Sequence, residues 1–418
     1  MHSPSDDVGK RLMQRIDELA MISESSEELT RRFATAEHRR ANDQVAHWMA
    51  QAGMQVHEDA IGNVIGRYEG ASASAPAIML GSHLDTVVNA GKYDGMLGVL
   101  CALACVESLS ARKQRLPQSI EVIGFADEEG VRYHTTFLGS RAVANQFDYQ
   151  QLDRLDKDGI RMRDALMSFG KDVNALPQAA REAEHIAAFV EVHIEQGPVL
   201  EQADLGVGVV KAIAGATRLI ATIDGTAGHA GTVPMTLRCD ALAAAAESLL
   251  GVEKICSGTT DLVGTVGEIL AEPGASNVIP GRATFSIDIR AADDAVRLDA
   301  VKRVIDHINT VCQRRQVKLS IDKVHEASSQ VCDARLIEHI SAAIAEHQPR
   351  VLSLSSGAGH DTMVMASLTA AGMIFVRCAG GVSHHPDESI TKDDAALAVD
   401  VLLQTVLNLS ESLPQQAS

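Results

Sequence analysis

A glycine-rich segment, GSHLDTVVNAGKYDGMLGV over residues 81–99, contains residue types that bind divalent metal ions. It places His83, Asp85 and Asp94 around a tight turn. Imidazole and carboxylate groups are ligands of zinc and similar ions, so His83 and Asp94 are candidate ligands. A carboxylate two residues beyond a ligand histidine can hydrogen-bond its second ring nitrogen, which would give Asp85 an orienting role. An ordinary salt bridge in a surface loop would produce the same pattern.

Three further segments supply acids or histidines after apolar runs: FADEEGVR with Glu128 and Glu129, FVEVHIEQGPVLE with His193, and GGVSHHPDE with His384 and His385. Consecutive side chains at the end of a strand point apart, so one acid can bind metal while the other faces the substrate as a proton-transfer group. Taken singly, each segment has a structural explanation. Adjacent acids are common on solvated turns, and a histidine in an apolar strand is commonly a hydrogen-bonded core residue.

The four segments together indicate a site for two metal ions. Four independent strand ends that each supply a histidine or an acid are hard to arrange by chance. Three imidazoles and two carboxylates are too many for one tetrahedral ion, but they fit two ions if one carboxylate bridges them. These five candidate ligands are His83, Asp94, Glu129, His193 and His384.

The elements that must position these residues are predicted from hydrophobic periodicity. Helical spacing at residues 6–21, 37–52 and 95–111 alternates with apolar runs at 62–70, 76–86, 119–129 and 187–197 that are typical of buried strands. This alternation predicts an α/β fold, a mixed sheet with helices on both faces. Ligands collect at the carboxyl ends of strands in such sheets, which is where the candidate residues occur.

A different pattern begins near residue 211. Strands at 217–225, 261–270, 283–290 and 316–324 alternate apolar and polar residues, and helices are expected at 235–251 and 293–315. This order predicts a ferredoxin-like α+β domain at 211–326, inserted into a larger domain formed by 1–210 and 327–418.

Composition excludes several classes of partner. The 418 residues include 55 acidic and 37 basic side chains, a net charge of −18, which disfavours nucleic acid and anionic membrane surfaces. No apolar run reaches the roughly 18 residues of a membrane helix, and the N-terminal residues lack the apolar core of a signal peptide. We therefore expect a cytoplasmic protein. Its seven cysteines show no CxxC spacing, so we expect reduced thiols.

The motifs, taken in order, resemble those of the hydantoinase/carbamoylase group of dinuclear-metal amidohydrolases. This group includes N-carbamoyl-L-amino-acid hydrolases, β-ureidopropionase and allantoate amidohydrolase, and is related to zinc aminopeptidases and aminoacylases. The resemblance extends from about residue 10 to about residue 410. It rests on the segments GSHLDTVVNAGKYDG, DEEG, EVHIEQGPVLE, GHAGTVPM, NVIPG, DIR, SGAGHD and SHHP.

The resemblance implies roles for the candidate ligands. His83, Asp94 and His384 are ligands of the metal sites, and Asp94 bridges to a second ion held by Glu129 and His193. Glu128 is the general base. The group usually has SHN or SHS where this chain has SHH, so the ligand is assigned to His384 rather than His385. Two divalent ions per subunit are implied, zinc or manganese, with cobalt or nickel also compatible with these ligands.

The resemblance also implies that the inserted domain is a lid and dimerisation domain, with substrate contacts from both subunits of a homodimer. His229 of GHAG can stabilise the tetrahedral oxyanion, and Arg290 of DIR suits a substrate carboxylate. Without that context, Arg290 could be an exposed strand residue paired with Asp288. The residues expected on the substrate side, besides His229, are Gln196, Asn277, Arg290, Gly359 and His360.

These inferences favour hydrolysis of a ureido group on a small carboxylic acid, with release of ammonia and carbon dioxide. Allantoate is the favoured substrate because the segments LTRRFATAEHRRAN and HTTFLGSRA resemble sequences assigned that role. N-carbamoyl-L-amino-acid hydrolase and β-ureidopropionase are the alternatives, followed by an aminoacylase or dipeptidase. A non-catalytic metal-binding protein would be expected to lose the base or a ligand, whereas here Glu128 and all five ligands are present.

Overall fold

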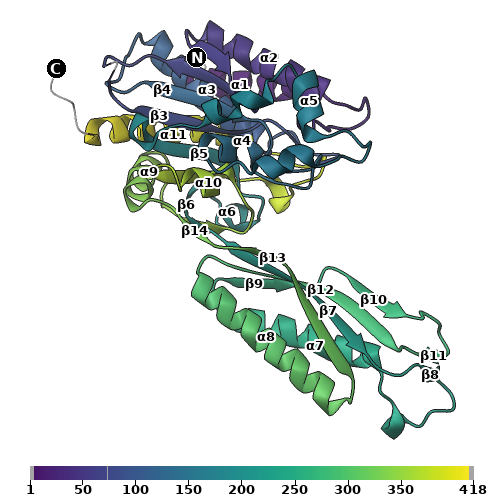
Figure 1. The fold of residues 1–418 in the computed structure, drawn as a ribbon. Coiled ribbons are helices and arrows are strands. Elements are labelled where there is room, and N and C mark those ends of the chain that lie inside the picture. Colours follow the sequence, from purple (N-terminus) through teal and green to yellow (C-terminus); the bar gives the residue numbers. More distant parts are fainter. Residues whose placement is uncertain (1–3, 73, 414–418) are drawn as a thin grey trace. The chain divides into compact units, whose positions relative to one another are not determined.

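The structure is a computed structural model that describes residues 4–72 and 74–413. The chain divides into two compact units (Figure 1). The first contains the chain up to Lys211, then Cys332–Leu354 and everything from Gly359 onward. The second contains Ala212–Val331 and the short segment Ser355–Ala358, which the sequence pattern did not assign to it.

The first unit is built on a mixed sheet with the strand order β1-β2-β4-β3-β5-β16-β6. Strands β4, β3, β5 and β16 are parallel to their neighbours within this group, and the outer strands are antiparallel. Two short strands, β14 and β15, also pair with β6, and β14 does so at Ala212 and Ile213, which belong to the second unit as β14 itself does. The bounds are β1 Gln55–Glu58, β2 Val64–Tyr68, β3 Ala77–His83, β4 Ile120–Phe125, β5 Ile186–Ile194, β6 Val207–Ile213, β14 Gln330–Val331, β15 Ser353–Ser356 and β16 Ala371–Val376.

Apolar residues cover both faces of this sheet, as the sequence predicted. Along β3, Ile78 and Leu80 join the large cluster that includes the helix after β3, while Met79 packs with Phe189 in a separate cluster. Every residue of β3 and β4 is buried, which is typical of parallel strands covered on both sides. The helices are α1 Pro4–Ala20, α2 Ala36–Gln51, α3 Met96–Ala111, α4 Leu138–Val143, α5 Met162–Ser168, α6 Val199–Gln202, α9 Ala334–His347, α10 Asp361–Met365 and α11 Lys392–Ser412.

The second unit is an antiparallel sheet with two helices, connected as strand, helix, strands, helix and strand (Figure 1). Its strand order is β10-β12-β7-β13, and β9 also pairs with β12. Strand β12 alternates buried and partly exposed residues, so its buried side chains form a core with the helices. The elements are β7 Gly215–Asp224, β8 Gly228–His229, α7 Ala241–Ser257, β9 Leu262–Thr265, β10 Ile269–Glu272, β11 Val278–Ile279, β12 Arg282–Ala291, α8 Asp294–Arg314 and β13 Lys318–Ala327.

Two predicted elements of this unit differ in the structure. The helix expected from residue 235 begins at Ala241, because the Asp240 side chain accepts a hydrogen bond from the Ala243 N–H and caps the helix there. The strand expected at 261–270 is two strands, β9 and β10, and both pair with β12. None of the helices in the described ranges has the length and apolar composition that a bilayer crossing requires.

Candidate metal centre

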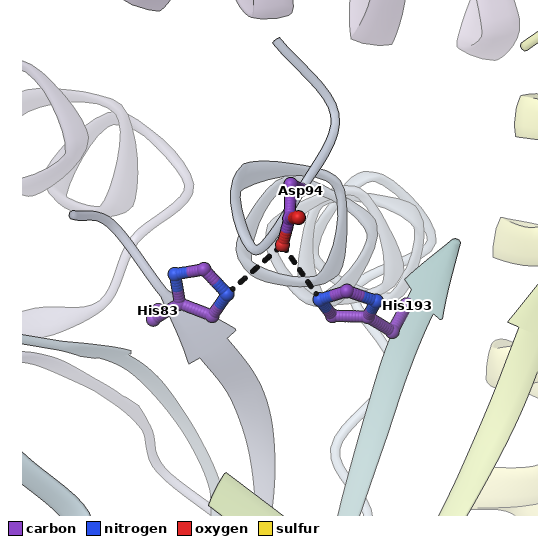
Figure 2. Close-up of side chains that lie close together, drawn as sticks. All are labelled: His83, Asp94 and His193. Carbon is purple, nitrogen blue, oxygen red and sulfur yellow. Dashed lines mark ion pairs between the residues drawn. The ribbon is translucent and has the colours of Figure 1, made fainter. Parts of the chain in front are cut away.

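Asp94 is the centre of the candidate site, and one of its two oxygens faces a pair of histidines (Figure 2). The Nε2 atom of His83 lies 3.3 Å from Asp94 Oδ1, and that of His193 lies 3.1 Å from the same oxygen. All three side chains are buried. His83 ends β3 and His193 lies near the end of the neighbouring parallel strand β5, so the strand order brings the two imidazoles together.

The second oxygen of Asp94 faces a different pair of residues. The Nε2 atom of His384 lies 3.3 Å from Asp94 Oδ2 and 3.7 Å from Glu129 Oε1. The ring of His385 instead faces Asp387, with 3.5 Å between Nδ1 and the carboxylate. This geometry supports the assignment of the ligand to His384 rather than to its neighbour.

The structure groups the candidate ligands differently from the partition that the resemblance implied. The resemblance implied that Glu129 and His193 hold one ion together, whereas the structure groups His83, Asp94 and His193 on one side and Asp94, Glu129 and His384 on the other. Within each group, ligand atoms lie within 4.8 Å of one another. The reason is strand order, because β5 carries His193 beside β3 while Glu129 lies beyond the end of β4.

Neighbouring groups orient the two buried histidines. His83 Nδ1 lies 3.0 Å from the main-chain oxygen of Asp85, and His193 Nδ1 lies 2.9 Å from the main-chain oxygen of Ile194. A carbonyl oxygen only accepts hydrogen bonds, so each Nδ1 is the donor and each ring directs its Nε2 atom at Asp94. Although burial opposes it, hydrogen bonds to Asp85 and Asp94 raise the pKa of His83 well above 6.5, and the bond to Asp94 raises the pKa of His193. A positive charge is therefore favoured between each ring and Asp94, and either a proton or a metal ion can supply it. The site therefore fits a cation held by these atoms.

Asp85 has contacts at the site beyond the one expected with His83. Its carboxylate lies 3.5 Å from His83 Nδ1, farther than its own main-chain oxygen. The carboxylate accepts hydrogen bonds from the N–H groups of Glu128 at 2.9 Å and Glu129 at 3.1 Å. Asp85 therefore fixes the turn that carries both acids as well as the ring of His83.

The site holds an excess of buried acidic groups. Burial raises the pKa of Glu128 well above its usual value, and the charge of Glu129 adds to this. Burial also raises the pKa of Glu129 to about 7, with the charge of Asp94 as the second cause. Glu129 Oε1 is buried without a hydrogen-bond partner among the described residues. Unpaired buried acids are costly, and divalent cations would remove that cost.

Glu128 lies against the same centre, since it forms a third group with His83 and Glu129 whose ligand atoms are within 4.8 Å of one another. The acid before it, Asp127, is also buried and was not singled out from the sequence. Burial, followed by the charge of Asp85, raises its pKa well above the usual value. In the sequence, only the position of Asp127 directly before Glu128 and Glu129 in the FADEEG segment could have indicated that it belongs to the site.

Three of the residues expected to contact substrate lie in the first unit. Gln196 donates hydrogen bonds from Nε2 to Asp94 Oδ2 at 2.8 Å and to Ser383 Oγ at 2.9 Å, so it contacts the candidate ligand directly. The ring of His360 meets that of His193 edge-on, with 4.4 Å between centroids. Gly359 is exposed beside it.

The other expected substrate contacts lie in the second unit. His229 and Asn277 are exposed and close in the β8–β11 ladder, where the Ala230 N–H donates to the Asn277 carbonyl at 2.9 Å. Arg290 donates from Nε and one terminal nitrogen to the two oxygens of Asp288, both at 2.9 Å, and from the other to the Gly357 carbonyl at 2.7 Å. The Asp288 pairing considered from the sequence is therefore present.

A mixed α/β sheet whose strand ends place three imidazoles and buried carboxylates around a shared aspartate is typical of metal-dependent hydrolases. Residues 79–408 match the model of peptidase family M20/M25/M40, and the chain belongs to this family.

Named relatives cover nearly the whole chain. Allantoate deiminase 2 of Glycine max is 41% identical over 95% of this chain and 88% of its own length. The N-carbamoyl-L-amino acid amidohydrolase of Geobacillus stearothermophilus is also 41% identical, over 96% of this chain and 99% of its own. A hydantoinase/carbamoylase family amidase from Burkholderia multivorans has a similar structure, with a TM-score of 0.91, 30% identity and coverage of 96% and 98%. The resemblance noted from the motifs is confirmed.

Proposed function

We propose that this protein hydrolyses a ureido carbon–nitrogen bond of a small carboxylic acid, with allantoate as the substrate. The 41% identity over 95% of the chain to a relative named allantoate deiminase carries this proposal. The buried ligand groups around Asp94 support it, since water is a poor nucleophile toward a ureido carbonyl unless it is activated. The retained Glu128 argues against a non-catalytic binding protein.

In the proposed reaction, one water cleaves the terminal carbon–nitrogen bond and gives ammonia and a carbamic acid, which loses carbon dioxide. Glu128 would accept a proton from the attacking water and deliver it to the departing nitrogen. Its place beside Glu129, on a turn held by Asp85, keeps its carboxylate at the edge of the sheet. Two divalent ions, when bound, would acidify the water and polarise the carbonyl.

We assign one ion to His83, Asp94 and His193 and the other to Asp94, Glu129 and His384. The proposed metal is zinc or manganese, and cobalt or nickel would suit the same imidazole and carboxylate donors. A cytoplasmic location is also proposed. The seven cysteines support it, since all are free thiols and six of them are buried, as expected in a reducing compartment.

We further propose that the first unit is the catalytic domain and the second a lid and dimerisation domain. A guanidinium has five N–H donors, and Arg290 uses three in the bonds to Asp288 and Gly357. Two therefore remain to clamp a substrate carboxylate. His229 would stabilise the oxyanion, and Asn277 is assigned to substrate binding with Gln196, Gly359 and His360.

A homodimer through the second unit is the proposed assembly. Leu250 on α7 is 67% exposed and Val263 on β9 is 60% exposed, although both are apolar. A cavity of about 470 Å³ between these elements is lined mainly by apolar side chains. Burying such a surface against a second copy would remove it from water, as homodimer interfaces do.

The test is ammonia release from purified protein reconstituted with zinc or manganese, beside a chelated control. The panel contains allantoate, N-carbamoyl-β-alanine, several N-carbamoyl-L-amino acids and one N-acetyl amino acid. We expect metal-dependent turnover of allantoate above the rest. If protein that holds two ions per chain releases no ammonia from any of the ureido compounds, the proposal is overturned.

An N-carbamoyl-L-amino-acid hydrolase is the second candidate, favoured by 41% identity over 96% of the chain to the Geobacillus stearothermophilus relative. Both candidate substrates combine a ureido group with a carboxylate, so the same machinery serves either. Preferential turnover of the N-carbamoyl-L-amino acids in the panel would select this candidate. Preference for the N-acetyl amino acid would indicate an aminoacylase.

A further inference from the structure

Glu388 connects two loops that are far apart in the sequence and that both carry candidate ligands. Its Oε1 atom accepts hydrogen bonds from the N–H groups of Tyr93 at 2.9 Å and Asp94 at 3.1 Å. Its own N–H donates to the carbonyl of His385 at 3.0 Å, which closes the turn beside His384. The side chain is buried.

The second carboxylate oxygen of Glu388 competes with Asp94 for one proton. Ser383 Oγ lies 3.1 Å from Glu388 Oε2 and 3.2 Å from Asp94 Oδ2. A serine hydroxyl has a single proton and can donate it to only one of them at a time. Gln196 Nε2 already donates to Ser383 Oγ at 2.9 Å, so the serine proton must be directed at one of the two acids.

The direction of the Ser383 proton decides whether Asp94 Oδ2 keeps a lone pair free for an ion. A carboxylate oxygen has two lone-pair directions, and Gln196 occupies one on Asp94 Oδ2 with a hydrogen bond of 2.8 Å. If Ser383 also donated to Asp94 Oδ2, neither direction would remain for an ion on the side of His384. If Ser383 donates to Glu388, one direction stays open.

Glycine at position 91 provides a second, independent observation. A Cβ atom there would lie 2.3 Å from Glu388 Cδ and 2.4 Å from Glu388 Cβ, which is far closer than two non-bonded carbon atoms can approach. Residue 91 therefore has to lack a side chain so that Glu388 can reach the Tyr93–Asp94 backbone.

We infer that Glu388 is a positioning residue for the metal centre. It holds the backbone of Asp94 and draws the Ser383 proton away from Asp94 Oδ2, which keeps that oxygen available to the ion shared with Glu129 and His384. This inference rests on the proposed two-metal function. It predicts that the charge of Glu388, and not only its size, sets the affinity for that ion.

The experiment measures bound zinc per chain by mass spectrometry after dialysis against a series of zinc buffers. In Glu388→Gln, the amide oxygen can still accept from the backbone, but the amide nitrogen donates to Ser383 and turns its proton toward Asp94. We expect one of the two ions to be lost at about 10- to 100-fold higher free zinc than in the parent. The exposed neighbour gives the control, Asp387→Asn, whose curve should overlay that of the parent.

The double variant Glu388→Gln/Ser383→Ala distinguishes this role from a merely structural one. Removing the hydroxyl removes the competing proton, so the double variant should recover much of the lost affinity. Gly91→Ala would displace the Glu388 side chain without changing its chemistry, so its loss of zinc affinity should be similar to that of Glu388→Gln. It replaces Glu388→Gln in the experiment if that variant does not fold. At saturating zinc, the kcat of Glu388→Gln should approach that of the parent, and its KM should equal that of the parent.

Two results would overturn the inference. The first is that the parent binds two ions and the zinc-binding curve of Glu388→Gln overlays that of the parent. The second is that the double variant binds zinc more weakly than Glu388→Gln alone. A parent that binds no metal would instead overturn the proposed function, so the two failures are distinguishable.

Discussion

The buried His38 provides a prediction about acid stability. It lies in α2 with no exposed surface, and its Nδ1 accepts a hydrogen bond from the Ala34 N–H at 3.1 Å. Burial lowers its pKa from 6.5 to about 4, because the charged ring would lose its hydration. The folded protein therefore keeps this ring neutral at pH values where the unfolded chain protonates it.

The sign and size of the effect follow from this difference in pKa. Between pH 6.5 and 4 the unfolded state binds more protons at this site than the folded state, so stability falls as pH falls. Each pKa unit corresponds to 1.36 kcal/mol, so the shift to about 4 removes about 3 kcal/mol across that window. Below pH 4 both states are protonated and the loss from His38 is complete.

Urea unfolding at a series of pH values measures this loss, with the fluorescence of Trp48 as the signal. Trp48 is the only tryptophan, lies on the same helix and is buried in the core. We expect the free energy of unfolding of the parent to fall by about 3 kcal/mol more than that of His38→Gln between pH 6.5 and 4. Glutamine can still accept from the Ala34 N–H, and it does not titrate.

The control is His47→Gln on the exposed side of the same helix, which should follow the parent. Parallel pH profiles for the parent and His38→Gln would refute the reasoning. They would mean that the ring is charged or hydrated in the folded state.

Three further predictions concern the site and the assembly. Glu128→Gln should bind metal and fold as the parent does but lose about 10²- to 10⁴-fold in kcat, and a loss of only a few-fold would remove its assignment as the base. Arg290→Ala should raise KM for anionic substrates far more than it changes the free energy of unfolding, measured by kinetics and urea titration. Unchanged kinetics would exclude Arg290 from the site. Leu250→Arg on α7 should convert a dimer into a monomer in sedimentation experiments, and an unaltered mass would place the interface elsewhere.

Much of the fold was predictable because local patterns determine it. Continuous apolar runs gave the buried strands β3, β4 and β5, and alternating runs gave the half-exposed strand β12. Errors occurred where a single side chain or a pairing choice decided the outcome. The Asp240 cap starts α7 six residues later than the hydrophobic pattern suggested, and pairing with β12 divides one expected strand into two.

For the metal centre, the sequence by itself determined the types of residue, because histidine and acid at successive strand ends have few other uses in combination. It did not determine how the candidate ligands are grouped. The grouping depends on strand order, which places His193 beside His83 and leaves Glu129 with His384. The roles of Asp85 and Glu388 also required the tertiary structure, because their hydrogen bonds join segments that no local pattern relates.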